Sequence, residues 1–159
     1  NPSAIALLPG RPRLLVSRTM SKAFAFAGAR VGYLAADPAV IDALRLVRLP
    51  YHLSALTQAA ALAALDHSAE MLGMVDEIVV QRDRISATLT ELGYTPLASW
   101  SNFVLFGGVA DPALMWQELY DRGILIRVVG IPGHLRVTAG TADETTAFLE
   151  ALASIDSNA

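Results

Sequence analysis

The stretch SRTMSKAFAFAGARVGY, residues 17–33, carries more information than any other part of this sequence of 159 residues. An apolar run at residues 13–17 leads into it, and a second run at residues 29–36 ends it. Both runs predict short strands, the first of them a buried one. The segment between them is rich in hydroxyl, basic and small residues, which is typical of a functional loop at the end of a strand.

The side chains of this loop suggest a particular chemistry. Lys22 has the hydroxyls of Thr19 and Ser21 three and one residues before it and Arg30 eight residues after it. We expect partial desolvation and the second cation to favour the neutral, nucleophilic form of the lysine amine. The hydroxyls and the guanidinium are donors that bind phosphate. An amine that can form an imine beside a phosphate pocket describes a pyridoxal-phosphate site.

A simpler interpretation exists for each part of this pattern. A Ser-Lys pair at a strand end is ordinarily a solvated turn, and the glycines at 28 and 32 are ordinary in a loop. The fixed order of hydroxyls, lysine, aromatic, glycine, arginine, glycine and aromatic makes a chance match improbable. The functional interpretation is therefore favoured.

Composition excludes several other classes of protein. The chain has 12 Lys and Arg against 15 Asp and Glu, for a formal net charge of −3, which argues against a nucleic-acid binder. With 53% hydrophobic and 17% charged residues it can bury a core. There is no cysteine, and the three histidines have no ligand spacing, so we expect no disulfide and no metal site. No membrane span or leader is expected, and the expected compartment is the cytoplasm.

The rest of the sequence contains several signals for helices and strands. Asp37 followed by Pro38 predicts a helix over residues 38–49, an alanine-rich stretch predicts one over 54–66, and an amphipathic stretch predicts a long one over 68–92. After residue 93 we expect strands at residues 95–98 and 103–106, a helix at 111–122, and strands at 124–128 and 134–138. A last helix is expected from the capping box Thr141 to Glu144 onward. We expect a domain boundary near residue 70.

These residues resemble a known family. The motif Thr19-x-Ser21-Lys22-Ala-Phe24, followed by Gly28-x-Arg30-x-Gly32-Tyr33, is similar to the lysine motif of fold-type I, class I and II aminotransferases. The resemblance runs from about residue 13 to 155 and includes the segments 49–54, 101–106, 123–127 and 134–140. The lysine motif together with the two arginine segments, 123–127 and 134–140, points to the histidinol-phosphate branch. It implies an α/β fold, in which residues 1–70 are the C-terminal part of the large domain that binds pyridoxal 5'-phosphate and residues 71–159 are a small α+β domain.

The resemblance also implies roles for single residues. Lys22 would bind the cofactor covalently as a Schiff base and then move the proton between the substrate α-carbon and the cofactor. Thr19, Ser21 and Arg30 would hold the cofactor phosphate.

Two arginines would bind the substrates. By resemblance, Arg136 would bind the carboxylate of glutamate or 2-oxoglutarate, and Arg127 the phosphate of histidinol phosphate or the distal carboxylate of glutamate. Both lie at strand ends in apolar sequence, where an unpaired guanidinium is costly unless an anion meets it. The alternative is an intramolecular ion pair with Glu118, Asp121 or Asp143.

The implied activity is the transamination of L-histidinol phosphate with 2-oxoglutarate, a step of histidine biosynthesis, by a cytoplasmic homodimer. An aromatic-amino-acid aminotransferase and a threonine-phosphate decarboxylase of the same fold are the alternatives. The family's aspartate for the pyridine nitrogen and its stacking aromatic would lie before Asn1, so we expect a fragment that lacks the N-terminal half. Val128 and Val129 stand where an acidic residue is expected. A catalytically silent fragment is the further alternative.

Overall fold

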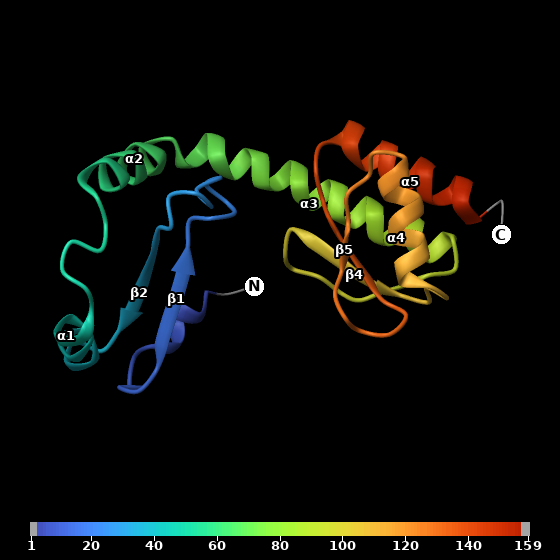
Figure 1. Ribbon diagram of the computed structural model, residues 1–159. Coiled ribbons are helices and arrows are strands. Elements are labelled where there is room, and N and C mark those ends of the chain that lie inside the picture. The colour runs from blue at the N-terminus through green and yellow to red at the C-terminus, as the bar shows by residue number, and fades with distance from the viewer. Residues whose placement is uncertain (1–2, 157–159) are drawn as a thin grey trace. The chain divides into compact units, whose positions relative to one another are not determined.

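The computed structural model describes residues 3–156, in a mixed α/β arrangement that divides into two units, Asn1–Leu72 and Gly73–Ala159 (Figure 1). Each unit has a sheet of its own. The first has two strands in the order β1-β2, and the second has four in the order β3-β4-β6-β5. The lysine motif lies in the first unit, and the two arginine segments lie in the second.

The first unit is organised around an antiparallel hairpin. After the short 3-10 helix η1 (Ala4–Leu7), β1 (Leu15–Thr19) pairs with β2 (Gly32–Ala36), which lies beside it in Figure 1. The register places Thr19 opposite Gly32. The second strand begins three residues later than predicted, because residues 27–30 form a turn.

The prediction that the first strand is buried was wrong for the described residues. Only Val16 of β1 is buried, while its other four residues are exposed. The run was apolar enough to suggest burial, but the hairpin has two strands and therefore offers each strand one neighbour. A small core forms instead beside the loop, from Met20, Val31 and Ala64, with Phe24 and Phe26 packed against it.

The helices of the first unit begin where their capping residues predict. α1 (Pro38–Val47) follows Asp37, whose carboxylate accepts the Ala39 N–H at 3.0 Å. α2 (Ala55–Asp66) follows Ser54, whose hydroxyl oxygen accepts the Thr57 N–H at 3.0 Å. Each cap satisfies a backbone donor that the first turn of a helix leaves unpaired.

The long helix α3 (Ser68–Glu91) was also predicted, and it begins in the first unit and continues in the second. Beyond it lie β3 (Thr95–Pro96), β4 (Phe103–Gly107), α4 (Pro112–Asp121), β5 (Arg127–Val128), β6 (Leu135–Thr138) and α5 (Ala142–Asp156). In the described part of the chain, no helix is long and apolar enough to span a membrane.

The second unit has an extensive core between its sheet and its helices. Val104 and Phe106 of β4 and Leu135 and Val137 of β6 are buried, together with Ile85 and Leu89 of α3, Leu119 of α4, and Phe148 and Leu152 of α5. Side chains alternate between the two faces of a strand. The opposite face of the sheet therefore carries Phe103, Leu105, Arg136 and Thr138, none of which is fully buried.

The fifth strand is shorter than its sequence predicted. Residues 124–128 were expected to be extended, but β5 comprises only Arg127–Val128. The Ile124 N–H donates to the Leu119 carbonyl at 2.9 Å and closes the end of α4, and the Ile126 carbonyl accepts the indole N–H of Trp116 at 2.9 Å. These two bonds engage the backbone that a longer strand would use for its ladder.

Candidate active site

The loop that carries the predicted lysine is closed by its own backbone. The Met20 N–H donates to the Val31 carbonyl at 3.0 Å, and the Phe26 N–H donates to the Met20 carbonyl at 3.2 Å. Met20 and Val31 are also buried in the small core of the first unit. The loop is thus anchored at both ends, so the backbone that carries the side chains between these ends has a fixed conformation.

The two predicted hydroxyls are in direct contact. Thr19 Oγ1 donates to Ser21 Oγ at 2.8 Å and accepts the Ser21 N–H at 3.0 Å. With the Thr19 proton directed to it, Ser21 Oγ keeps its own proton available for an external acceptor. The pair therefore presents a donor at the end of β1, beside the lysine.

Arg30 lies on the other side of the loop in a left-handed backbone conformation. Its φ of 55° is uncommon for a residue with a side chain, and Ala25 shares the feature with a φ of 53°. The guanidinium is exposed and donates to the Ala27 carbonyl at 3.0 Å. One donor is thereby used to fix the side chain, and the others are left for a ligand.

Lys22 is exposed among the described residues. The partial desolvation that its place after an apolar strand predicted is therefore not found here, because the strand itself is largely exposed. What the loop does provide is a primary amine, two hydroxyls and a guanidinium on one closed segment. This donor set fits a ligand with an aldehyde and a phosphate, as pyridoxal phosphate has.

A glycine is required where the two strands meet. A Cβ at position 32 would lie 2.5 Å from the Arg18 carbonyl oxygen, which is backbone and cannot rotate away. Gly28, the other glycine of the motif, has nothing within 4 Å of such a position. The hairpin thus requires a glycine at position 32, whereas position 28 has space for a side chain.

The two predicted substrate arginines form one rung of the second sheet. Arg127 of β5 is the direct partner of Arg136 of β6, which in turn pairs with Leu105 of β4. Residues directly opposite in an antiparallel pair project to the same face, and like charges placed so are destabilising. An anion bound between two guanidinium groups on this rung would relieve such repulsion.

Arg136 has a distinctive environment on this rung. Its guanidinium carbon lies 4.7 Å from the centroid of the Phe103 ring, and its Nε is buried with no hydrogen-bond partner in the described chain. Phe103 lies in the family-like segment 101–106, but the sequence alone predicts no role for it. The signal that could have found it is the alternation of β4, which places it on the face of Arg136.

The alternative of an intramolecular ion pair is not realised in residues 3–156. The side-chain ion pairs described there join Arg45 to Asp42, His67 to Glu70, and Arg82 to Asp83. Of the partners considered for the two substrate arginines, Asp121 accepts from Gln117 at 2.8 Å and Asp143 is exposed.

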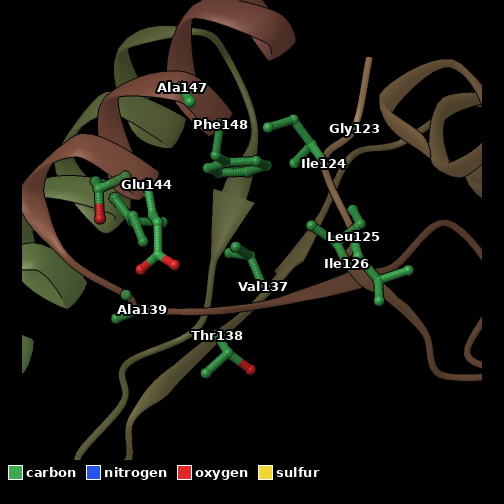
Figure 2. Close-up of a pocket in the computed structure, with 13 residues that line it drawn as sticks. Gly123, Ile124, Leu125, Ile126, Val137, Thr138, Ala139, Glu144, Ala147 and Phe148 are labelled. Carbon is green, nitrogen blue, oxygen red and sulfur yellow. The ribbon is translucent and has the colours of Figure 1, made fainter. Parts of the chain in front are cut away.

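The second unit also contains an apolar cavity of about 440 Å³. In Figure 2, Phe148 and Glu144 of α5 lie on one side of it, and Ile124 and Ile126 lie on the other. Its lining includes neither Arg127 nor Arg136. The cavity is therefore separate from the arginine rung, and it lacks the cationic donors that an anionic substrate needs.

Glu144, the acidic residue that lines this cavity, has a structural role at the start of α5. The Glu144 carboxylate accepts the Thr141 N–H at 2.8 Å and the Thr141 hydroxyl at 3.1 Å, in the predicted capping box. These hydrogen bonds, the backbone one first, hold the pKa of Glu144 below its ordinary value of 4.5. Over the described range, no cluster of three or more His, Cys, Asp or Glu could hold a metal ion.

Comparison with protein families gives one match that spans most of the chain. The model described as aminotransferase class I and II matches residues 1–152. Among curated proteins, the histidinol-phosphate aminotransferase of Paenarthrobacter aurescens is 67% identical over 154 residues, covering 97% of this chain and 41% of the relative. That of Mycolicibacterium smegmatis is 63% identical over 155 residues, with coverages of 97% and 41%. The chain thus spans about 41% of the length of these relatives.

Solved structures are similar to most of this chain. The histidinol-phosphate aminotransferase of Sinorhizobium meliloti, solved in complex with pyridoxal-5'-phosphate, is similar with a TM-score of 0.81 and 30% identity. The match covers 97% of this chain and 44% of that one. The mixed α/β fold described above therefore corresponds to part of a fold-type I aminotransferase structure.

Proposed function

The chain belongs to the aminotransferase class I and II family, and we propose that the complete protein transfers an amino group between L-histidinol phosphate and 2-oxoglutarate. The observation that carries the proposal is the closed lysine loop with its amine, hydroxyl and guanidinium donors. It occurs in a chain 67% identical over 154 residues to a curated histidinol-phosphate aminotransferase. At that identity, the histidinol-phosphate branch is better supported than the aromatic or decarboxylase alternatives.

The first unit would bind pyridoxal 5'-phosphate. When bound, this cofactor supplies an electron sink that makes the α-proton of an amino substrate removable. Ser21 Oγ, with the proton that Thr19 leaves free, and the remaining donors of Arg30 would hold its phosphate. Lys22 Nζ would bind its aldehyde carbon and later take the proton from the substrate α-carbon as a general base.

The second unit would bind the anionic ends of the substrates. Arg136 would bind a carboxylate of glutamate or 2-oxoglutarate, and Arg127 the phosphate of histidinol phosphate or the distal carboxylate of glutamate. The pairing of the two side chains on one rung supports this, because an anion relieves their repulsion. In the proposal, the first unit is the C-terminal part of the large domain and the second is the small α+β domain. The homodimer and the cytoplasmic location also remain predictions.

A chimera tests the proposal. These 159 residues replace the matching 154 residues of the Paenarthrobacter aurescens relative, and the product is assayed with histidinol phosphate and with phenylalanine as amino donors. We expect histidinol phosphate to react faster. An inactive but folded chimera would favour the silent-fragment alternative, and faster reaction of phenylalanine would favour the aromatic branch.

Lys22 offers the largest expected effect on activity. Lys22→Ala should lower kcat of the chimera by on the order of 10³-fold or more, because both cofactor attachment and proton transfer are lost. Lys22 is the single lysine of the sequence. Borohydride reduction in the presence of pyridoxal phosphate should therefore add one pyridoxyl group to the side chains of this chain, on the peptide from Thr19 to Arg30. Unchanged labelling of the Lys22→Ala variant would contradict the assignment.

A further inference from the structure

Trp116 of α4 connects that helix to the backbone just before β5. Its indole N–H donates to the Ile126 carbonyl at 2.9 Å. The ring is half-buried and packs against the core of the second unit. It also stacks on Tyr120, which lies one turn further along α4, with ring centroids 5.0 Å apart and an interplanar angle of 16°. Core and stacking together hold the indole donor in one orientation relative to the helix.

The accepting carbonyl belongs to the peptide group that joins Ile126 to Arg127. A peptide group is planar, so a hydrogen bond to its oxygen also fixes the direction of the bond that leads into Arg127. The Ile126 side chain is 7% exposed and lies in the core, whereas the Arg127 side chain is exposed. The bond from Trp116 therefore orients the peptide group from which the Arg127 side chain leaves the core.

This restraint acts where the sheet supplies few others. β5 has two residues and a single neighbour in the sheet, β6. One of the two rungs between these strands places Arg127 opposite Arg136, and like charges placed so disfavour the pairing. A hydrogen bond from the adjoining helix stabilises the backbone at this point, because it does not depend on the ladder between β5 and β6.

We propose that Trp116 is a positioning residue for Arg127, whose backbone its indole N–H holds so that the guanidinium meets the distal anion of the substrate. The inference rests on the proposed function, which assigns to Arg127 the phosphate of histidinol phosphate or the distal carboxylate of glutamate. Trp116 touches no substrate in this role. Its loss should therefore weaken the binding of substrates that carry the distal anion and spare those that lack it.

A truncated substrate tests this selectivity. In the chimera, Trp116→Phe keeps an aromatic ring and removes the N–H. In the half-reaction with the amino donor alone, KM for histidinol phosphate should rise about two- to tenfold, the range of one hydrogen bond, and the rate at saturation should change by less than about twofold. KM for L-histidinol, which lacks the phosphate, should change by less than about twofold. An unchanged KM for histidinol phosphate, or equal rises for both donors, would overturn the inference.

A double-mutant cycle tests whether the effect passes through Arg127. Arg127→Ala removes the guanidinium at an exposed position. If Trp116 acts by positioning this group, Trp116→Phe should raise KM for histidinol phosphate no further once Arg127→Ala is present, since effects that share one group are not additive. Additive rises would assign Trp116 a purely structural role and would contradict the proposal.

A second substitution keeps the test decisive if the smaller ring of Trp116→Phe unfolds the unit. Incorporation of a benzothiophene side chain in place of the indole at position 116 retains the two-ring shape and removes the N–H, and it should give the same rise in KM for histidinol phosphate. The matched control is Tyr120→Phe, which keeps the ring stacked on Trp116 and should leave KM for both donors unchanged.

A binding measurement separates this inference from the proposed function. Calorimetry of succinate, whose second carboxylate represents the distal anion, requires no turnover. If the chimera transaminates neither histidinol phosphate nor phenylalanine but its succinate affinity shows the same coupling between positions 116 and 127, the proposed function fails and the positioning role stands. If histidinol phosphate reacts faster than phenylalanine while Trp116→Phe changes neither its KM nor the succinate affinity, the positioning role fails alone. A chimera that neither reacts nor binds succinate would overturn both.

Discussion

The two units of this chain differ in how their apolar residues are used. In the second unit, residues from three helices and two long strands of the sheet meet in one core, where Leu89, Phe106 and Leu152 are each 0% exposed. In the first unit, the described core has only Met20, Val31 and Ala64, while Leu46 of α1 is 87% exposed. The predicted cofactor residues all lie in the unit with the smaller core.

Within these residues, the larger apolar core and the predicted cofactor residues lie in different units. The second unit obtains its stability from burial, which contributes roughly 25 cal/mol per Å² of apolar surface. The first unit holds its lysine loop mainly through backbone hydrogen bonds, at Met20 to Val31 and Phe26 to Met20, and leaves no room for a Cβ at Gly32. Substitutions should therefore divide into those that unfold the second unit and those that disturb the loop.

Truncation of a core leucine provides the sharpest test of this contrast. Leu89→Ala should lower the free energy of unfolding of the second unit by about 2–5 kcal/mol, because it leaves a cavity in a packed core. Leu125→Ala, at a position of the same unit that is 76% exposed, should change this free energy by less than about 0.5 kcal/mol. Urea unfolding followed by fluorescence measures the second unit, which contains both tryptophans, Trp100 and Trp116. Equal losses would refute the contrast.

A glycine substitution tests the loop in the same way. Gly32→Ala should destabilise the β1–β2 hairpin by about 1–3 kcal/mol, since the added Cβ would lie 2.5 Å from the Arg18 carbonyl oxygen. It should reduce pyridoxyl labelling of Lys22 and leave the tryptophan-monitored transition unchanged. The control is Gly28→Ala, where the added Cβ has open space. If Gly28→Ala reduced labelling as much as Gly32→Ala, the role of the close contact would be wrong.

The smallest expected effect concerns the capping box of α5. Because the folded pKa of Glu144 is lowered from 4.5, its contribution to stability is complete above pH 4.5 and is lost as the pH falls through the lowered pKa. The urea midpoint of the second unit should therefore be lower for Glu144→Gln than for the unsubstituted chain at pH 7, and this difference should shrink near pH 3. A difference that does not depend on pH would contradict this origin.

Local signals predicted most of the helices. Four helices begin with a capping residue whose side chain accepts a backbone N–H of the first turn: Asp37, Ser54, Asp111 and Thr141. The starts of these helices can therefore be predicted from neighbouring residues. Strand ends were predicted less well, because they depend on distant partners. The shortened β5 reflects bonds to Leu119 and Trp116, which no periodicity in residues 124–128 reveals.

The candidate site shows the same division. The contact of Thr19 with Ser21 joins residues two positions apart and follows from the motif itself. The pairing of Arg127 with Arg136 depends on the register of two strands, and the stacking of Phe103 on Arg136 depends on a third strand. Burial of β1 was predicted wrongly, since apolar composition alone does not say how many neighbours a strand has.

The arginine rung has one more consequence, for behaviour in salt. β5 is an edge strand of two residues, and one of its two rungs brings a pair of cations together. Dissolved ions screen such repulsion over about 8–10 Å at 0.1–0.15 M ionic strength. We therefore expect the pairing of β5 with β6 to become more stable as the salt concentration rises, so that dissolved ions help to keep this edge of the sheet paired.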